Sequence, residues 1–259
     1  MTQLAPHPGE RPGELMKVYC AVLSIWLLVA ADFSKAGPPF VTDDPEPPPP
    51  GGWEINVPFI LERTPGETEM DAPLFDFNYG LPDIQLKLEF PIEIVNGDSN
   101  GTQAGAGDSL IGVKWRFFNN ERSQFQLGTY PQVLVPTGNH SRGLGEGRAA
   151  FVLPFLALKN WEKWTLYGNI GHWWQGAHET RNYFYAGAVL EREINEQLEL
   201  GVELFGNSPK EHGGRSELAF NVGGTWKLNA HLNLLFSGGR DIVGDTHAMA
   251  YIGLQLLTK

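Results

Sequence analysis

The chain has little cysteine, little positive charge and few charged residues of any kind. Its single cysteine, Cys20, lies in a segment that we expect to be removed, so we expect a mature protein without disulfides or thiolate chemistry. Charged residues make up 19% of the chain, below the roughly 25% of an ordinary soluble domain. The net charge is −11. It argues against nucleic acid as a partner, because nucleic-acid binding needs a basic surface.

The most apolar run, residues 18–31, is shorter than the about 20 residues of a transmembrane helix. Lys17 precedes this run, and Ser34-Lys35-Ala36 follows it as a small-x-small cleavage site. This order is typical of a secretory signal peptide. We therefore predict that residues 1–36 are an N-terminal extension and a cleaved signal peptide, with Met16 rather than Met1 as the true start. A cytoplasmic N-terminal anchor is the alternative.

Residues 37–52, GPPFVTDDPEPPPPGG, are rich in proline. They cannot pair as a strand, because proline has no backbone N–H to donate. We predict an extended periplasmic N-terminal segment that precedes the first strand. A plain linker would have the same composition.

From Trp53 to Lys259 the chain alternates strand patterns with turns. The 31 glycines, the 12% aromatic residues and the scarcity of charge favour an all-β architecture. We count about twelve strand segments, an even number within the range of bacterial barrels. They cover residues 53–63, 70–79, 83–95, 108–118, 123–135, 148–158, 163–175, 182–192, 197–206, 215–227, 231–240 and 246–257. The predicted fold is an up-and-down antiparallel transmembrane β-barrel over residues 53–259.

The connections between these segments alternate in length. Those after even-numbered strands are short, as at 80–82 and 193–196, whereas those after odd-numbered strands are longer or richer in glycine, as at 96–107 and 136–147. Membrane barrels have short periplasmic turns on one rim and longer loops on the outer rim. A soluble β-sandwich has no physical reason to keep this alternation through the whole chain.

Aromatic residues are predicted to form a girdle at each rim, because their amphipathic rings prefer the membrane interface. The predicted periplasmic girdle contains Trp53, Trp115, Phe117, Phe118, Trp161, Trp164 and Trp226. The predicted outer girdle contains Trp173, Trp174, Tyr183, Phe184 and Tyr185.

Within the predicted strands, apolar and polar residues alternate, as in LELGVEL at 198–204. In a membrane barrel the apolar face contacts lipid and the polar face lines the lumen. Ten charged residues fall on predicted lumen-facing positions. They are Lys87, Glu89, Glu93, Lys114, Arg116, Glu191, Glu199, Glu203, Glu217 and Lys227. These charges could line a narrow, selective passage, or they could pair with one another in a purely structural barrel.

The residues at the start of the mature chain resemble a known family. Gly37-Pro38-Pro39-Phe40, 42–46 (TDDPE) and Trp53-Glu54 are similar to the opening of a family of bacterial outer-membrane barrels named for the meta-pathway of phenol degradation. The resemblance implies an exported barrel that takes up hydrophobic or aromatic compounds. It implies no catalytic residues.

The sequence predicts no catalytic residue, no metal site and no cofactor. Ser141 beside His140, and Ser216 near His212, are the residues to consider for a lipid hydrolase, but no Gly-x-Ser-x-Gly turn supports them. His172 and His178 lie six residues apart around a loop, without the ligand spacing of a metal site.

Three functions compete on this evidence. The first is an outer-membrane channel or transporter, in contact with outer-membrane lipid, that passes a small hydrophobic or aromatic solute. The second is an outer-membrane lipid-modifying enzyme, and the third is a soluble periplasmic β-sandwich that binds a ligand. The alternating loops, the girdles and the export signal favour a non-enzymatic barrel in the bacterial outer membrane. Nothing in the pattern specifies an oligomeric state.

Overall fold

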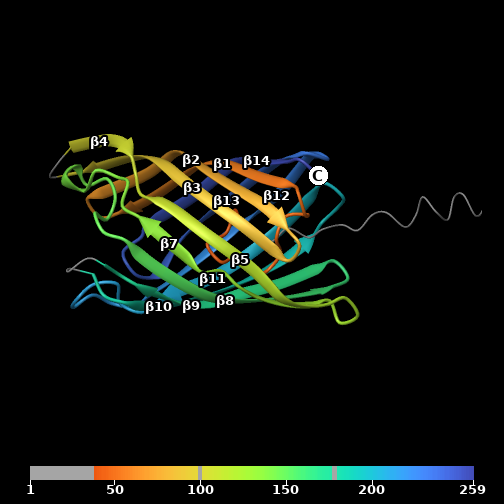
Figure 1. Ribbon diagram of the computed structural model, residues 1–259. Helices are drawn as coiled ribbons and strands as arrows, with labels where there is room; N and C mark the ends of the chain where they lie inside the picture. The colour runs from red at the N-terminus through yellow and green to blue at the C-terminus, as the bar shows by residue number, and fades with distance from the viewer. Residues whose placement is uncertain (1–37, 99–100, 177–179) are drawn as a thin grey trace, which may run out of the picture. The chain divides into compact units, whose positions relative to one another are not determined.

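The computed structural model describes residues 38–98, 101–176 and 180–259. The predicted leader, with Cys20 and Met16, lies outside these residues, and so does His178. Within the described ranges no helix is long and apolar enough to cross a membrane. The described residues wind into a barrel of tilted strands (Figure 1). The strands are β1 (Trp53–Thr64), β2 (Glu67–Leu81), β3 (Ile84–Gly97), β4 (Gly101–Ala106), β5 (Ser109–Asn120), β6 (Phe125–Thr129), β7 (Gln132–Val135), β8 (Ala150–Trp161), β9 (Trp164–Trp174), β10 (Tyr183–Glu193), β11 (Leu198–Asn207), β12 (Glu217–Asn229), β13 (Leu232–Val243) and β14 (Ala248–Leu257).

The sheet closes on itself. β1 pairs antiparallel with β14, from Glu54↔Leu257 to Arg63↔Ala248. β4 and β5 both pair with β3, and β6 and β7 both pair with β5 and β8, so each of these two pairs is one interrupted span of the wall. The wall therefore has twelve antiparallel spans. The predicted all-β, up-and-down barrel is confirmed. Closure leaves no open strand edge, whose backbone N–H and C=O groups would find no hydrogen-bond partner in lipid.

The span that the sequence predicts as one strand over 123–135 is broken at Tyr130 and Pro131. Pro131 has no N–H to give to the ladder, and Pro154 on the neighbouring β8 cannot donate either. The carbonyl oxygen of Pro154 instead accepts two bonds, from the Thr129 hydroxyl at 2.7 Å and from the Tyr130 N–H at 3.3 Å. Side-chain and backbone donors thus replace the regular ladder at this point.

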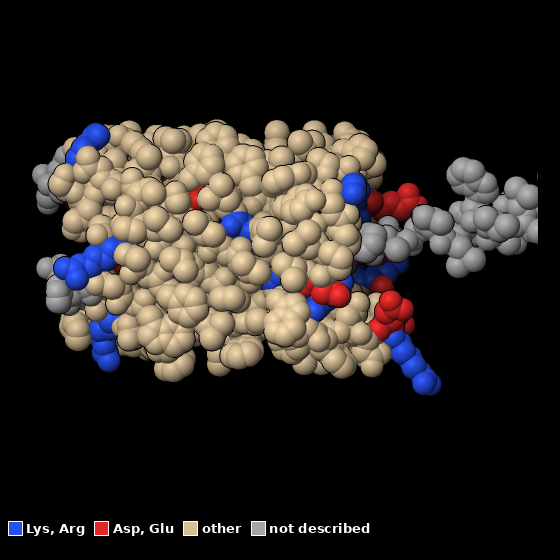
Figure 2. Space-filling model, in the orientation of Figure 1, with Lys and Arg blue, Asp and Glu red and all other residues tan. Residues whose placement is uncertain are grey.

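The outward face of the barrel is apolar. On β11, Leu200 and Val202 are 38% and 52% exposed, whereas Glu199 and Glu203, which flank them in the sequence, are buried inside. Charged atoms gather at the two ends of the face in Figure 2, and the belt between the ends is almost free of them. This pattern is the reverse of a soluble protein, in which apolar residues fill the interior. It fits a wall in contact with lipid, so the alternative of a soluble β-sandwich is wrong.

The two rims differ in their connections. At one rim, here called the turn rim, the connections are 82–83, 121–124, 162–163, 194–197 and 230–231. At the opposite rim, here called the loop rim, the longest connection is 136–149, which contains a short 3-10 helix, His140–Arg142. Loops of outer-membrane barrels face the cell exterior, so the loop rim is the outer one.

Two of the longer loops expected from the sequence do not form. β1 and β2 are joined by the tight turn Pro65-Gly66, in which Gly66 has a φ of 84° that suits glycine. Half of the expected loop 96–107 is strand β4, which pairs with β3 from Ile92↔Ala106 to Gly97↔Gly101. The glycines and alanines of this stretch indicated a loop, but the pairing partner offered by β3 overrides that local preference.

The predicted outer girdle is only partly correct. Trp174 and Phe184 project outward and are 40% and 61% exposed. Trp173, Tyr183 and Tyr185 instead line the lumen. These three residues alternate with the outward pair along β9 and β10, so strand geometry sends them to the other face.

We expect a charge in the outer wall to destabilise the barrel in a depth-dependent way. Val202→Arg, in the middle of β11, should lower the free energy of unfolding by about 2–4 kcal/mol. Leu228→Arg, at the turn rim, should lower it by only about 0–1 kcal/mol. Urea titration of folding into lipid vesicles, followed by tryptophan fluorescence, measures both. Equal small effects would contradict a lipid-facing wall.

Candidate functional site

Residues 38–48 lie in the lumen of the barrel. The sequence suggested an extended periplasmic segment over 37–52, and this location is wrong for residues 38–48. Thr42 and Asp44 are 2% and 0% exposed, because barrel residues surround them. The segment enters from the turn rim, where the backbone N–H of Gly51 donates to the carbonyl oxygen of Gly80. From there it runs up the inside of the barrel (Figure 1). Its prolines, which exclude it from the wall, do not hinder an extended course through the lumen.

Glu203 on β11 holds the tip of this segment. Its Oε1 accepts the backbone N–H of Thr42 at 2.6 Å, and its Oε2 accepts the backbone N–H of Val41 at 3.2 Å. Asn221 on β12 donates its side-chain amide to Oε2 at 2.7 Å. A buried carboxylate needs such donors, and hydrogen bonds to a charged group are stronger than neutral ones.

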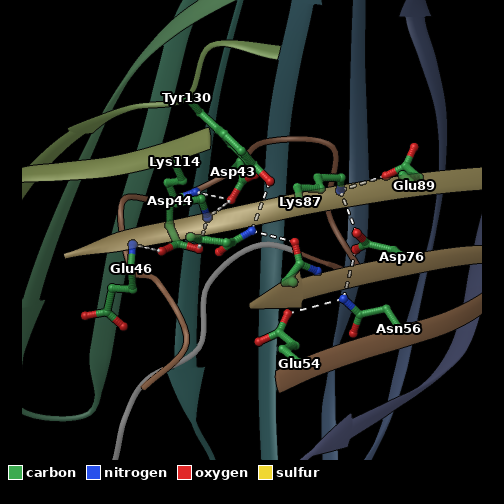
Figure 3. A network of polar contacts seen from close by, with 12 residues as sticks. Asp43, Asp44, Glu46, Glu54, Asn56, Asp76, Lys87, Glu89, Lys114 and Tyr130 are labelled. Atoms are coloured by element: carbon green, nitrogen blue, oxygen red, sulfur yellow. Dashed lines mark hydrogen bonds and ion pairs between the residues drawn. The ribbon is translucent and has the colours of Figure 1, made fainter. Parts of the chain in front are cut away.

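Lys114 on β5 holds the next two residues. Its ammonium lies 2.7 Å from Oδ1 of Asp43 and 4.0 Å from Oδ2 of Asp44. Figure 3 shows the carboxylates of Asp43 and Asp44 pointing toward Lys114. Burial raises the pKa of Asp44 well above its usual range, although Lys114 opposes this effect. Further down, the Gln126 amide donates to the Glu46 carboxylate.

An apolar contact completes the attachment. Phe40 packs in a buried cluster with Leu158, Tyr167 and Val189 on β8, β9 and β10. The wall approaches so closely that a Cβ at Gly201 would lie 2.9 Å from the Phe40 ring. Glycine in the wall therefore makes room for the segment, as it does wherever another group must approach a strand closely.

All ten charged residues singled out in the sequence lie on the inward side of the wall, but in different surroundings. Lys114 and Glu203 contact the N-terminal segment, and Lys87 and Glu89 pair with each other. Arg116 lies near the turn rim, where it binds Asp83 and Gln126. Glu217 pairs with Lys210 at 2.9 Å near the loop rim. The remaining four are Glu93, Glu191, Glu199 and Lys227.

A second polar cluster lies beside the segment, on β2 and β3. The Lys87 ammonium is 3.1 Å from Asp76 and 2.7 Å from Glu89, as Figure 3 shows. Asn56 donates to the other oxygen of Asp76 at 3.0 Å, and Gln85 donates to the Tyr130 hydroxyl at 2.9 Å. In this part of the lumen one ammonium group thus pairs with two carboxylates.

The lumen above the segment contains a cavity of about 510 Å³. The N-terminal segment forms part of its lining, through residues 38–43, so it occupies the path between this cavity and the turn rim. The rest of the lining mixes aromatic, aliphatic, polar and charged side chains. Its aromatic residues are Tyr130, Trp173, Tyr183, Tyr185, Phe205 and Tyr251. A cavity of this size and lining is typical of small-molecule sites.

Four side chains that line this cavity carry a buried polar atom without a hydrogen-bond or ion-pair partner among the described residues. These atoms are the Tyr251 hydroxyl, Asn169 Oδ1, Asn221 Oδ1 and Thr42 Oγ1. Buried polar atoms are normally hydrogen-bonded. These groups therefore keep unused hydrogen-bonding capacity beside the cavity.

The sequence reasoning missed several residues of the site. Asp43 and Asp44 were assigned to the periplasm with the rest of their segment, and no local signal indicates that they enter the lumen. Asp76 was detectable in principle, because it alternates with the outward-facing Phe75 and Phe77 on a predicted strand. The aromatic lining was assigned to a girdle instead.

The residues considered for catalysis or metal binding form no recognisable centre. Ser141 donates to Asn139 and His140 contacts the carbonyl oxygen of Gly145, so the two side chains are engaged elsewhere on an exposed loop. His172 faces outward between Trp174 and Phe184, with ring centroids 4.5 and 4.3 Å away. The part of the chain that the structure describes holds no cluster of His, Cys, Asp and Glu suited to a metal ion.

We expect Glu203 to control access to the tip of the segment. Without Cys20 the chain has no native cysteine, so Thr42→Cys gives a single label site in the lumen. Adding Glu203→Leu removes the acceptor of two backbone N–H groups and should speed maleimide labelling at least about tenfold, because each such bond contributes about 1.5–3 kcal/mol. Glu211→Leu, an exposed loop change, is the control. Unchanged labelling with Glu203→Leu would show that the carboxylate does not hold the segment.

Solved structures of outer-membrane barrels resemble this fold. A crystal structure of an outer membrane channel from Pseudomonas putida F1 shares 18% identity, covers 83% of this chain and 98% of its own, and gives a TM-score of 0.70. The NanC porin shares 8% identity, with coverage of 78% and 98% and a TM-score of 0.55. The KdgM porin shares 10% identity, with the same coverage and a TM-score of 0.52. At these identities the likeness establishes the fold.

The family comparison is more specific. None of the curated proteins compared with the chain is a match. A family model described as "Putative MetA-pathway of phenol degradation" matches residues 47–250. The resemblance expected from the opening residues is thereby confirmed. Since the match spans most of the chain, the chain belongs to this family, which is named for the MetA-pathway of phenol degradation.

Proposed function

We propose that the protein is an outer-membrane channel that takes up small aromatic or hydrophobic molecules through a lumen closed by residues 38–48. The observation that carries this proposal is the cavity of about 510 Å³ on the outer side of the N-terminal segment, with Trp173, Tyr183 and Tyr185 in its lining. A purely structural barrel has no need of a preformed cavity. The family to which the chain belongs is named for phenol degradation, which agrees with an aromatic solute.

The chemistry of the cavity favours a ring with a polar substituent. Tyr130, Trp173 and Tyr185 offer faces and edges against which an aromatic ring can stack. The unpaired Tyr251 hydroxyl or the unpaired Asn169 carbonyl oxygen can bond a hydroxyl group of the solute. A phenol presents both features, whereas an alkane presents neither.

Passage to the periplasm requires the N-terminal segment to move. Its attachment consists of separable contacts: the hydrogen bonds to Glu203, the ion pair between Asp43 and Lys114, and the packing of Phe40. Its backbone is not a member of the wall, so it can leave without opening the barrel. The N-terminal segment can thus move while the wall stays closed.

Deletion of residues 38–46 should open the lumen. In planar bilayers we expect larger and more frequent conductance steps than for the complete chain. Gly201→Phe should have the same direction of effect, because the new ring would occupy the place of Phe40. Val41→Ala, which keeps the contacts of the segment, is the matched control. A tight seal with the deletion variant would contradict a channel.

The unpaired polar atoms should set the preference for phenols. Tyr251→Phe combined with Asn169→Leu should weaken phenol binding about fivefold to tenfold, since one hydrogen bond contributes about 1 kcal/mol. Toluene binding should be unchanged, because toluene has no hydroxyl group. Saturation-transfer NMR with both ligands measures the ratio. An equal loss for both ligands would mean that the substitutions damage the cavity rather than remove its polar contacts.

A further inference from the structure

Two arginines project from the lipid-facing side of the wall near the loop rim. Arg63 lies at the end of β1, on the face of Leu61 and Phe59, and Arg240 lies on β13, on the face of Ile242. Both are exposed. A cation facing lipid destabilises a barrel least near the interface. The role of these two side chains therefore depends on the anion that they meet there.

In the folded barrel, each arginine is separated from the acid that is its neighbour in the sequence. Glu62 precedes Arg63, and Asp241 follows Arg240. Because neighbouring residues of a strand point to opposite faces, both acids lie inside the barrel. There Thr246 ties them down: its hydroxyl donates to Glu62 at 2.8 Å, and its backbone N–H donates to Asp241 at 3.0 Å. The wall itself keeps each acid away from the adjacent arginine.

No other acid replaces them on the outer face of the described strands. Arg63 lies opposite Thr68 on β2 and opposite Ala248 on β14. Arg240 lies opposite Phe220 on β12, and it is one step beyond the paired Gly239 and Met249. The guanidinium of Arg240 contacts only the backbone oxygen of Asp241, at 3.4 Å, in the described part of the chain. Asp245, in the nearby loop, lies 3.6 Å from Arg215 instead.

The two arginines form a pair across β14. Each lies next to Ala248 in register, on opposite sides, so their backbones are two strand steps apart, about 10 Å. The small Ala248 side chain leaves the surface between them open. Exposed apolar residues lie on the turn-rim side of the pair, including Phe59 and Ile252, whereas Ile242 and Val243 lie beyond Arg240 toward the loop rim. The result is a surface with two cations above an apolar patch.

We propose that Arg63 and Arg240 bind the two phosphates of the lipid A part of lipopolysaccharide, in the outer leaflet. Lipid A carries one phosphate at each end of a disaccharide and acyl chains beneath it, so two cations above an apolar surface complement it. Arginine binds phosphate through two parallel N–H donors. The loop rim is the outer rim, where this lipid is present. The face drawn in Figure 2 has mostly Lys and Arg at the same rim, which is the sign that an anionic leaflet attracts.

Native mass spectrometry of the purified protein in detergent tests the proposal. The probes are lipid A with both phosphates, lipid A with its phosphates removed, and phosphatidylglycerol. The unmodified protein should retain diphosphorylated lipid A most strongly. Arg63→Gln combined with Arg240→Gln should reduce that retention at least about tenfold and should leave the retention of dephosphorylated lipid A unchanged.

Two further variants make the test specific. Arg142→Gln removes a loop arginine at the same rim, whose guanidinium contacts Gln103, and it should retain lipid A like the unmodified protein. Arg63→Lys combined with Arg240→Lys keeps both charges and should retain more lipid A than the glutamine pair, which is informative even if the glutamine variant folds poorly. Heat-modifiable migration verifies that each variant is a closed barrel.

Several results would overturn the proposal. Equal retention of diphosphorylated lipid A by the glutamine pair and the unmodified protein is one. Equally strong retention of phosphatidylglycerol by the unmodified protein is another, because it would indicate a general anionic-lipid contact. A protein dimer that the glutamine pair abolishes, without any change in lipid A retention, would assign the surface to a second copy of the chain.

Discussion

Within lipid, every backbone N–H and C=O group must find its hydrogen-bond partner in the protein itself. This constraint requires the pairing of β1 with β14, because an open edge would expose a row of unpaired groups. Closure in turn creates a lumen, and the alternation of side chains divides each strand between lipid and lumen. The site, the segment inside it and the outer arginines all follow from this division.

A closed barrel of twelve spans leaves an interior that its own side chains do not fill. The N-terminal segment and the charged wall solve this problem together. Buried acids such as Glu203 and cations such as Lys114 would be costly if unpaired, and the segment supplies the backbone N–H groups and the Asp43 carboxylate that pair with them. The same contacts that stabilise the closed lumen are those that passage of a solute must break.

Much of the wall could be predicted from the sequence, since alternation is a local property. The apolar residues of the stretches 198–204 and 218–226 lie on the outward face as expected. The charged residues that alternate with them lie inward. Loops were harder to predict. The glycine-rich stretch before Asp108 became strand β4, because its fate depended on pairing with β3 rather than on its own composition. Trp173 and Tyr185 were misplaced because proximity to a rim does not decide which face a side chain takes.

The alternation of apolar and polar residues predicts strands that cross the membrane, the face of most strands that meets lipid, and the places of the lumen charges. These properties follow from a period of two residues. The folded barrel was needed to show that residues 38–48 lie inside it, that Asp43 meets Lys114, and that Thr246 holds Glu62 and Asp241 away from the neighbouring arginines. Those contacts join residues far apart in the chain, and they exist only because closure brings the strands that carry them together.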